Sequence, residues 1–317
     1  MAQKTMHKHL KFVSTVNMPH EEWLARRRNS IGGSDSAAVV GLNAYVSPYS
    51  LWAEKTGRVP GFAGNLATEV GTYMEDFVAR KFAEVTGKKV RRFNKIIYNP
   101  DYPFAHVNID RDVVSEDAGL ECKTVDSLSM KKFKGGEYPA NFYVQCVHSM
   151  AVTGAKRWYL AVLIGNKEFK WFTIDRDEDE IAALMTAERD FWELVKMGTP
   201  PAIDGTAATS EALKAVYSQS DETTCDLTAF SANLQQYIAL KKQIKELETL
   251  AEEAANRVKL FMGESGGGVC DGFAVSWKSQ TRSTFDVKRF TKENPDIDLS
   301  GYYKKTDSRI FRVSETN

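Results

Sequence analysis

The stretch GLECKT, residues 119–124, places an acidic and a basic side chain two positions apart in a strand-like run. Successive side chains of a strand point to opposite faces, so Glu121 and Lys123 share one face while the side chain of Cys122 points away. Asp110 lies eleven residues before Glu121, in another strand-like run, and the intervening SEDAG can reverse the chain into an antiparallel hairpin. The pattern therefore predicts that Asp110, Glu121 and Lys123 converge on one sheet edge.

A sheet edge of this kind could hold a divalent metal ion. Mg²⁺ takes hard oxygen ligands in near-octahedral geometry, so the carboxylates of Asp110 and Glu121, the backbone carbonyl of Cys122 and waters would suffice, and a phosphodiester oxygen would complete the shell. The ion would lower the pKa of a bound water, which Lys123 could orient or help to deprotonate. The residues predict a centre for phosphodiester hydrolysis, although so short a pattern also fits an ordinary solvated ion pair on an exposed face.

The hairpin imposes a geometric requirement on this centre. A symmetric turn at Glu116–Gly119 would set Asp110 opposite Val125, about four residues or roughly 13 Å along the strand from Glu121. Sharing one ion would then need a bulge or a strong bend near Asp110, a feature often found beside active sites. We therefore expect the strand to be irregular at Asp110.

The segments around this centre alternate between helical and strand patterns. N-capping residues, apolar periodicity and terminal glycines predict helices from Pro19 to the glycines at 32 and 33, from Ser34 or Asp35 onward, and over 47–57, 65–87, 139–154 and 177–198. Alternating or β-branched runs predict strands within 88–99, 104–114, 120–125, 157–165 and 168–175. This mixture is typical of an α/β (α+β) fold with an interrupted sheet.

The helix expected over 65–87 has an apolar stripe, with Glu75 beside it. The stripe consists of Val70, Met74, Phe77, Val78 and Phe82. Because an apolar stripe on a helix normally faces the core, these residues predict the side on which the helix packs.

A segment rich in Pro, Gly, Ser and Thr, GTPPAIDGTAATS from Gly198, separates two regions. We expect a first domain over 1–205 and a C-terminal extension over 206–317. In the extension, apolar residues recur at alternating steps of three and four, which predicts one long helix over about 230–262. This seam consists of Tyr237, Leu240, Ile244, Leu247, Ala251, Ala254, Val258 and Phe261. It fits either a helix docked on its own protein or a contact with another copy or a partner.

A small β-rich tail is expected beyond this helix, over about 268–317. The stretches VCDGFAVSWKSQ and SRIFRVSE alternate like two strands. Basic residues such as Lys278 and Arg282 lie nearby, but acidic residues are interspersed, so the charge pattern is weak support for DNA binding.

Composition sets broad limits on function. The chain has 317 residues, of which 43% are hydrophobic, and its 42 basic residues balance 42 acidic ones, so any nucleic-acid site must come from local patches. The four cysteines are widely spaced, which fits neither a zinc nor an iron–sulfur site and indicates reduced thiols. The N-terminus has no apolar signal core, and no segment approaches the ~18 consecutive apolar residues of a membrane span. We therefore expect a cytoplasmic protein with no membrane partner.

Five segments in series resemble the YqaJ-like phage recombinase nucleases, which are relatives of lambda exonuclease in the PD-(D/E)XK nuclease superfamily. The segments are GGSDSAAVVGLNAYVSPYSLWAEKTGR, GTYMEDFVARKFAEVTG, NIDRDVV, LECKT and YVQCVHSMAVTGAKRWYLAVLIG. Their order and spacing match from Arg26 to roughly Pro200. The resemblance implies a restriction-endonuclease-like core, with a central mixed sheet flanked by helices, and it assigns the superfamily's acid and Glu-x-Lys motif to Asp110, Glu121 and Lys123.

The same resemblance implies further residues of the site. Glu75 would be another acid near the metal, and Gln145 would be the helix glutamine beside the lysine. In relatives the segment before the Gly-Ser turn contacts the 5′ phosphate of DNA, which makes Arg28 and Ser34 candidates here. A hydroxyl and N–H groups at a helix N-terminus beside a guanidinium would suit a phosphate.

Two choices among neighbouring residues follow from these assignments. Arg26 and Arg27 compete with Arg28 for the phosphate, and the sequence does not separate them. His106 and His148 are left out of the chemistry, because a lone histidine is more often structural than catalytic.

By resemblance, the chain would be a Mg²⁺-dependent exonuclease, with Mn²⁺ able to substitute, that degrades linear duplex DNA from 5′ ends. It would leave a 3′ single strand for a phage annealing protein and would act in the host cytoplasm. The resemblance also implies a homo-oligomer, a trimeric ring that encloses DNA.

Two alternatives remain open. The same core could cut DNA internally, as a repair or restriction-type endonuclease, and a covalently closed duplex would separate the two activities. The chain could instead be a catalytically silent DNA-binding or scaffold protein, with the heptad helix as its binding surface. The complete set of Asp110, Glu121 and Lys123 argues against this second alternative.

Overall fold

The computed structural model describes residues 9–304 and 308–315, which form two compact units that divide between Ser218 and Gln219. The division falls later than residue 205 because α7 (Ala207–Val216) packs on α3 (Pro48–Lys55) of the first unit. Ala212 of α7 is buried, and the hydroxyl of Thr209 donates a hydrogen bond of 2.7 Å to Ser47 Oγ. The Pro- and Gly-rich segment is thus a connection inside the first unit.

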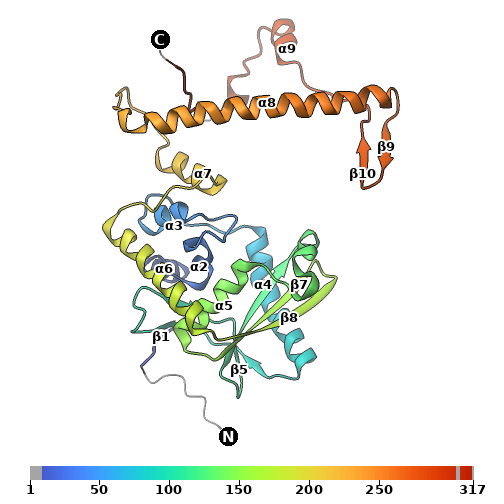
Figure 1. The fold of residues 1–317 in the computed structure, drawn as a ribbon. Coiled ribbons are helices and arrows are strands. Elements are labelled where there is room, and N and C mark those ends of the chain that lie inside the picture. Colours follow the sequence, from blue (N-terminus) through green and yellow to red (C-terminus); the bar gives the residue numbers. More distant parts are fainter. Residues whose placement is uncertain (1–8, 305–307, 316–317) are drawn as a thin grey trace. The chain divides into compact units, whose positions relative to one another are not determined.

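A five-stranded mixed sheet forms the centre of the first unit (Figure 1). The strand order is β2-β5-β6-β7-β8, in which β6 and β7 are parallel and the other neighbours are antiparallel. The strands are β2 (Val90–Arg91), β5 (Arg111–Val113), β6 (Ala118–Val125), β7 (Arg157–Ile164) and β8 (Glu168–Asp175). The mixed sheet flanked by helices confirms the predicted fold class.

A second sheet contains strands that lie between β2 and β5 in the chain. It has the order β1-β3-β4 and is antiparallel throughout. Its strands are β1 (Lys11–Ser14), β3 (Lys95–Tyr98) and β4 (His106–Asn108). The strand-like run at 104–114 is therefore divided between two sheets, with β4 in this one and β5 in the five-stranded one.

Helices cover both faces of the five-stranded sheet. Besides α3 and α7, the helices of the first unit are α1 (His20–Arg28), α2 (Gly33–Val39), α4 (Leu66–Thr86), α5 (Ala140–Thr153), α6 (Glu178–Met197) and a 3₁₀ segment at Ser127–Gly136. Across the described residues, no helix is both long enough and apolar enough to cross a membrane.

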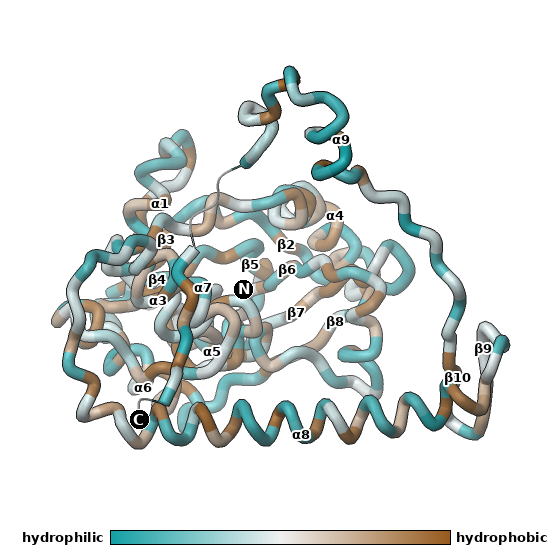
Figure 2. Tube along the Cα trace, turned by 90° about the horizontal axis from the view of Figure 1, so that it is seen from above, coloured by the Kyte–Doolittle hydropathy of each residue, from teal (hydrophilic) through white to brown (hydrophobic). Residues whose placement is uncertain are grey.

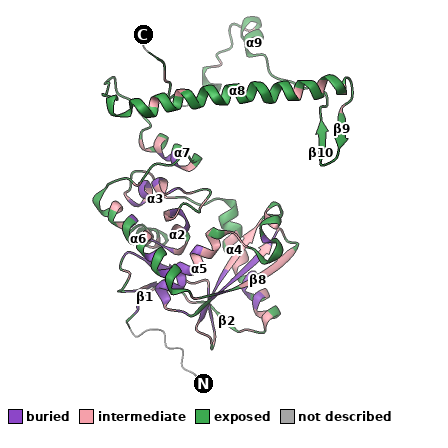
Figure 3. Cartoon of the chain, in the orientation of Figure 1, coloured by how far each residue is buried: buried purple, intermediate pink, exposed green. Residues whose placement is uncertain are grey.

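The two faces of the sheet have separate cores, which are seen as buried segments in Figure 3. Trp158, Leu160 and Val162 of β7 pack with the buried residues of α2, α3, α5 and α6. Tyr159 and Ala161, between them in sequence, pack with Val78, Ala79 and Phe82 of α4. Because neighbouring side chains of a strand point to opposite faces, α4 lies on one face and α5 on the other.

The prediction that the apolar stripe of α4 faces the core is wrong for the first half of the helix. Val70 and Phe77 are exposed, and the helix faces the sheet with Gly71, Glu75, Val78 and Phe82 instead. A Cβ on Gly71 would lie 3.7 Å from Thr124 Oγ1 of β6, an ordinary van der Waals distance, so this side of the helix lies next to the strand. The buried face is rotated from the predicted one and brings Glu75 toward the sheet.

The second unit is dominated by α8 (Ser231–Met262), which matches the helix predicted from the heptad pattern. It continues into an antiparallel hairpin of β9 (Gly267–Cys270) and β10 (Phe273–Ser276), followed by α9 (Val287–Glu293), with 3₁₀ turns at Thr228–Phe230 and Ser300–Tyr302. The prediction of a strand in SRIFRVSE, residues 308–315, is wrong. VCDGFAVSWKSQ contributes to both strands of the hairpin, and SRIFRVSE has no regular secondary structure and pairs with neither strand.

Candidate active site

The β5–β6 hairpin brings Asp110 directly beside Glu121. Arg111 pairs with Leu120 and Asp112 with Gly119, so the turn lies at 114–117 and the next position outward from Arg111 would face Glu121. The expected register, with Asp110 opposite Val125, is wrong by four positions. Ser115 adopts the left-handed conformation, with φ of 67°, and closes the turn two residues earlier than assumed.

Gly119 explains why the sequence was misleading. It looks like a turn residue, but it lies inside β6, next to Trp158 of β7. A Cβ on Gly119 would lie 2.3 Å from the indole ring of Trp158, so no side chain fits there. Gly119 therefore makes room for the indole and is not needed for the turn.

The strand is irregular at Asp110, as predicted. β4 ends at Asn108 in one sheet and β5 begins at Arg111 in the other, so Ile109 and Asp110 form the crossing. Asp110 Oδ2 accepts a hydrogen bond of 2.8 Å from the backbone N–H of Cys122. Because the N–H and C=O of one strand residue point to the same side, the Cys122 carbonyl also faces Asp110.

Glu121, Lys123 and Gln145 form a closed triangle of contacts on the α5 face of the sheet. Lys123 Nζ lies 2.7 Å from Glu121 Oε1 and donates a hydrogen bond of 2.9 Å to Gln145 Oε1. Gln145 Nε2 donates to Glu121 Oε1 at 2.6 Å. Cys122 packs with the α4 cluster on the other face, as the alternation predicts. Glu121 is only 3% exposed, so the pair is not an ordinary solvated one.

Glu75 reaches the same sheet edge from α4 but has a partner of its own. The guanidinium of the buried Arg111 contacts the carboxylates of Glu75 and Asp76 and the backbone carbonyl of Asp110. Sequence reasoning missed Arg111 and Asp76. The signal was an arginine inside a strand, since a buried arginine requires anionic partners. Arg111 thus fixes α4 against the crossing that carries Asp110.

The charges around Asp110 and Glu121 favour a bound cation. Burial raises the pKa of Asp110 well above its usual range, and the nearby negative charges of Glu121 and Glu75 raise it further. Burial alone would lower the pKa of Lys123, but the charges of Glu121 and Asp110 outweigh it and raise that pKa. Crowded carboxylates of this kind are relieved by a divalent ion.

The donor set fits Mg²⁺ only if solvent completes the shell. Within the described ranges, no three Asp, Glu, His or Cys side chains are grouped closely enough to hold an ion by themselves. Asp110 and Glu121 supply two carboxylates, and the Cys122 carbonyl faces the same side. Mg²⁺ is commonly held by one or two carboxylates with several waters and substrate phosphate, so these residues suit it.

The residues predicted to bind phosphate lie at the α1–α2 connection. Arg27 Nη2 donates a hydrogen bond of 2.7 Å to Ser34 Oγ, whereas Arg28, at the end of α1, is exposed and its side chain makes no hydrogen bond or ion pair among the described residues. The structure therefore brings Arg27 to Ser34. A Cβ on Gly33 would lie 3.2 Å from Gln145 Cγ, so this connection packs directly on the helix that carries Gln145.

A buried lysine holds this connection in place. Lys55 Nζ donates to the backbone carbonyls of Arg27 (2.7 Å) and Ser30 (2.9 Å) and to Asp35 Oδ2 (2.6 Å). Burial alone would raise the pKa of Asp35, but the charges of Lys55 and Arg27 outweigh it and lower that pKa. All three protons of the ammonium have acceptors, which offsets the cost of burying its charge.

Both histidines set aside from the chemistry are buried structural groups. His148 Nδ1 lies 2.8 Å from Glu188 Oε1, and its Nε2 donates to the His106 carbonyl at 2.9 Å. Burial alone would lower the pKa of His148, but Glu188 raises it. His106 Nδ1 bonds to Ser30 Oγ at 2.8 Å, and burial lowers the pKa of His106 to about 3.

Comparisons with known proteins agree with this fold. The model of the YqaJ-like viral recombinase domain matches residues 22–156. The uncharacterized protein YqaJ of Bacillus subtilis (strain 168) is 37% identical over 306 residues, which cover 95% of this chain and 96% of the relative.

Solved structures share the fold. An alkaline exonuclease from Laribacter hongkongensis, LHK-Exo, matches with a TM-score of 0.50 and 22% identity over 56% of this chain and 93% of its own. The structure of LHK-Exo in complex with dAMP matches with the same TM-score and coverage and 23% identity. Given the relative that matches along almost its whole length, the chain belongs to the YqaJ-like viral recombinase family.

Proposed function

We propose that this protein is a Mg²⁺-dependent exodeoxyribonuclease that degrades linear duplex DNA from 5′ ends and leaves 3′ single strands for annealing-based recombination. The observation that carries the proposal is the contact triangle of Glu121, Lys123 and Gln145 beside the carboxylate of Asp110. Membership of a viral recombinase family and the fold shared with an alkaline exonuclease support the choice of DNA as substrate. The direction of cleavage rests on the family resemblance.

In the proposed reaction, Asp110, Glu121 and the Cys122 carbonyl hold the ion. When bound there, Mg²⁺ or Mn²⁺ supplies neutralisation of the phosphate charge and a lowered pKa of coordinated water. Glu121 and Gln145 hold the Lys123 ammonium at a fixed place, from which it donates to a phosphate oxygen or orients the attacking water. Because the neighbouring carboxylates raise its pKa, Lys123 carries its charge at neutral pH.

Recognition of the 5′ phosphate is proposed for Arg27 and Ser34, with Arg28 as the neighbouring candidate. The Ser34 hydroxyl accepts from Arg27 and keeps its own proton for a phosphate oxygen. Lys55 holds the backbone of Arg27, and Gly33 packs on Gln145, so a phosphate bound here would be kept in a fixed relation to the catalytic triangle.

The proposal includes two partners that rest on the family resemblance alone. One is a phage annealing protein that receives the 3′ strand. The other is further copies of the same chain, in a trimeric ring around the DNA. This chain has no large positive net charge that could hold it on DNA. A ring around the DNA would supply processivity instead.

The proposal is tested by digesting a linear duplex labelled at one end, with a 5′ phosphate or a 5′ hydroxyl, in Mg²⁺ or in EDTA. Label should leave from 5′ ends first, only with the metal, and a covalently closed circle should stay intact. Cleavage of the circle would indicate an endonuclease. Release from 3′ ends would reverse the direction, and full activity in EDTA would exclude the metal.

A further inference from the structure

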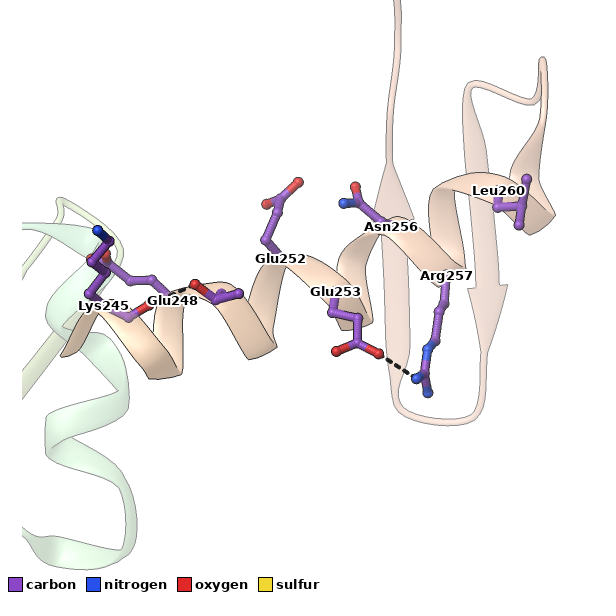
Figure 4. Close-up of a pocket in the computed structure, with 8 residues that line it drawn as sticks. Lys245, Glu248, Glu252, Glu253, Asn256, Arg257 and Leu260 are labelled. Carbon is purple, nitrogen blue, oxygen red and sulfur yellow. Dashed lines mark hydrogen bonds and ion pairs between the residues drawn. The ribbon is translucent and has the colours of Figure 1, made fainter. Parts of the chain in front are cut away.

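The polar face of α8 carries two ion pairs within the helix. Arg257 Nη2 lies 2.5 Å from Glu253 Oε1 on the next turn, and Lys259 Nζ lies 2.7 Å from Glu252 Oε1. Figure 4 shows Glu252, Glu253 and Arg257 along a shallow hollow that is lined by α8 alone and is polar except for Leu260. These four charges are paired within the helix and so do not need partners from outside it.

The opposite face has an apolar seam without a partner among the described residues. Leu240, Ile244, Leu247 and Val258 are all exposed, and no residue of α8 is buried. Figure 2 shows hydrophobic residues recurring along the whole length of the helix. At the N-terminal end, the ring of Phe311 packs on Tyr237 with 5.6 Å between ring centroids. The seam from Leu240 onward remains open.

Between Leu240 and Val258, the side-chain sizes along this open seam are arranged in opposite order in its two halves. Large residues come first, at 240, 244 and 247, and smaller ones follow, at 251, 254 and 258. If a second copy of the helix is turned end over end about a point near residue 249, each large residue of one seam faces a smaller residue of the other. Leu240 then faces Val258, Ile244 faces Ala254, and Leu247 faces Ala251.

We propose that α8 pairs with α8 of a second copy of this chain as an antiparallel coiled coil in this register. Each of its six layers contains one large and one smaller side chain, which keeps the distance between the helices even and fills the core without voids. A parallel pair would instead stack Ala251 on its equivalent and Ala254 on its equivalent. Two such layers next to three large ones would leave the core unevenly filled.

The size of the contact is sufficient for association. Six layers, extended by the exposed Leu250 beside the two-fold axis, remove roughly 1,000 Å² of surface from water, which is about the lower limit for a specific interface. Glu248 is the one unfavourable neighbour, since its carboxylate approaches its equivalent across the axis. The pairing should therefore tighten modestly when Glu248 is neutralised.

The pairing is tested by the mass of the full-length chain in solution, measured by light scattering over a range of protein concentrations. The wild-type mass should be an even multiple of the chain mass, and Ile244→Asp should halve it. Thr249→Asp, on the polar face of the same helix, should not change it and controls for the helix propensity of Asp. A seam that docks on its own chain or on a different protein would leave the mass unchanged in Ile244→Asp, which would overturn the proposal.

Disulfide cross-linking tests the orientation. The exposed Cys225 and Cys270 are first replaced by Ser. Co-expressed, differently tagged chains that carry Leu247→Cys and Ala251→Cys should then form a mixed disulfide on mild oxidation, while Ala251→Cys alone should form none. A disulfide in Ala251→Cys alone would place equivalent residues together and would exclude the antiparallel register.

Discussion

The two units contain apolar side chains in regular patterns, but only the first unit buries them. All buried residues of the described chain lie in the first unit, where β7 has packing partners on both faces. In the second unit α8 has a complete heptad seam, and no described residue of that unit is buried. A heptad pattern determines a helix locally, whereas a buried strand also requires neighbours from distant parts of the chain.

This difference separates two roles within one chain. The match with LHK-Exo covers 56% of this chain, and the match with the B. subtilis relative covers 95% of it. The two proposals above assign the chemistry to the first unit and the association to the second.

The largest expected effect on stability contrasts one leucine in each unit. Leu160→Ala empties part of the buried core of β7 and should lower the free energy of unfolding by about 2–5 kcal/mol. Leu260→Ala removes a side chain that is 85% exposed and should change it by less than about 0.5 kcal/mol. Denaturant unfolding followed by circular dichroism measures both variants. A large effect of Leu260→Ala would show that α8 is covered on that side as well.

The next effect concerns the pH dependence of stability in the first unit, which should depend on the buried His106. The pKa of His106 is about 3 in the folded chain and about 6.5 when unfolded, so the unfolded state binds a proton that the folded state does not. The resulting stabilisation is complete above pH 6.5 and is lost as the pH falls toward 3, by about 1.4 kcal/mol per unit in the steepest range. His106→Gln should unfold with a flatter dependence between pH 6.5 and 5. An unchanged slope would contradict the burial of a neutral His106.

The smallest of the three effects concerns the two arginines at the end of α1. Arg27→Gln should slow digestion of a 5′-phosphorylated duplex by about tenfold, because it removes a charge-assisted contact, and it should affect a 5′-hydroxyl duplex much less. Arg28→Gln is the matched control and should have a smaller effect, since Ser34 is not its partner. An equal loss of digestion rate in both variants would indicate that both arginines bind the 5′ phosphate.

Local features of the sequence predicted much of this structure. α8 and most helices of the first unit were found from caps, periodicity and terminal glycines. The shared face of Glu121 and Lys123 followed from strand alternation, and the structure brings both to Asp110 and Gln145.

What could not be predicted depends on contacts between residues far apart in sequence. The register of the β5–β6 hairpin depends on the packing of Gly119 against Trp158, a residue of another strand. The rotation of α4 depends on the ion pair between Glu75 and Arg111 of β5, and the choice of Arg27 depends on Lys55, which holds its backbone from α3. A single-sequence pattern contains the residues in each case but not their partners.

The central claim is that the buried Glu121 belongs to a nuclease centre, and one pair of variants tests it most directly. Glu116 lies in the turn of the same hairpin, and its carboxylate pairs with Lys88 and Tyr159 away from Lys123. The rate of digestion of a linear duplex in Mg²⁺ should fall at least about a thousandfold in Glu121→Gln and should change little in Glu116→Gln. Wild-type activity in Glu121→Gln, with the fold intact by circular dichroism, would contradict this account.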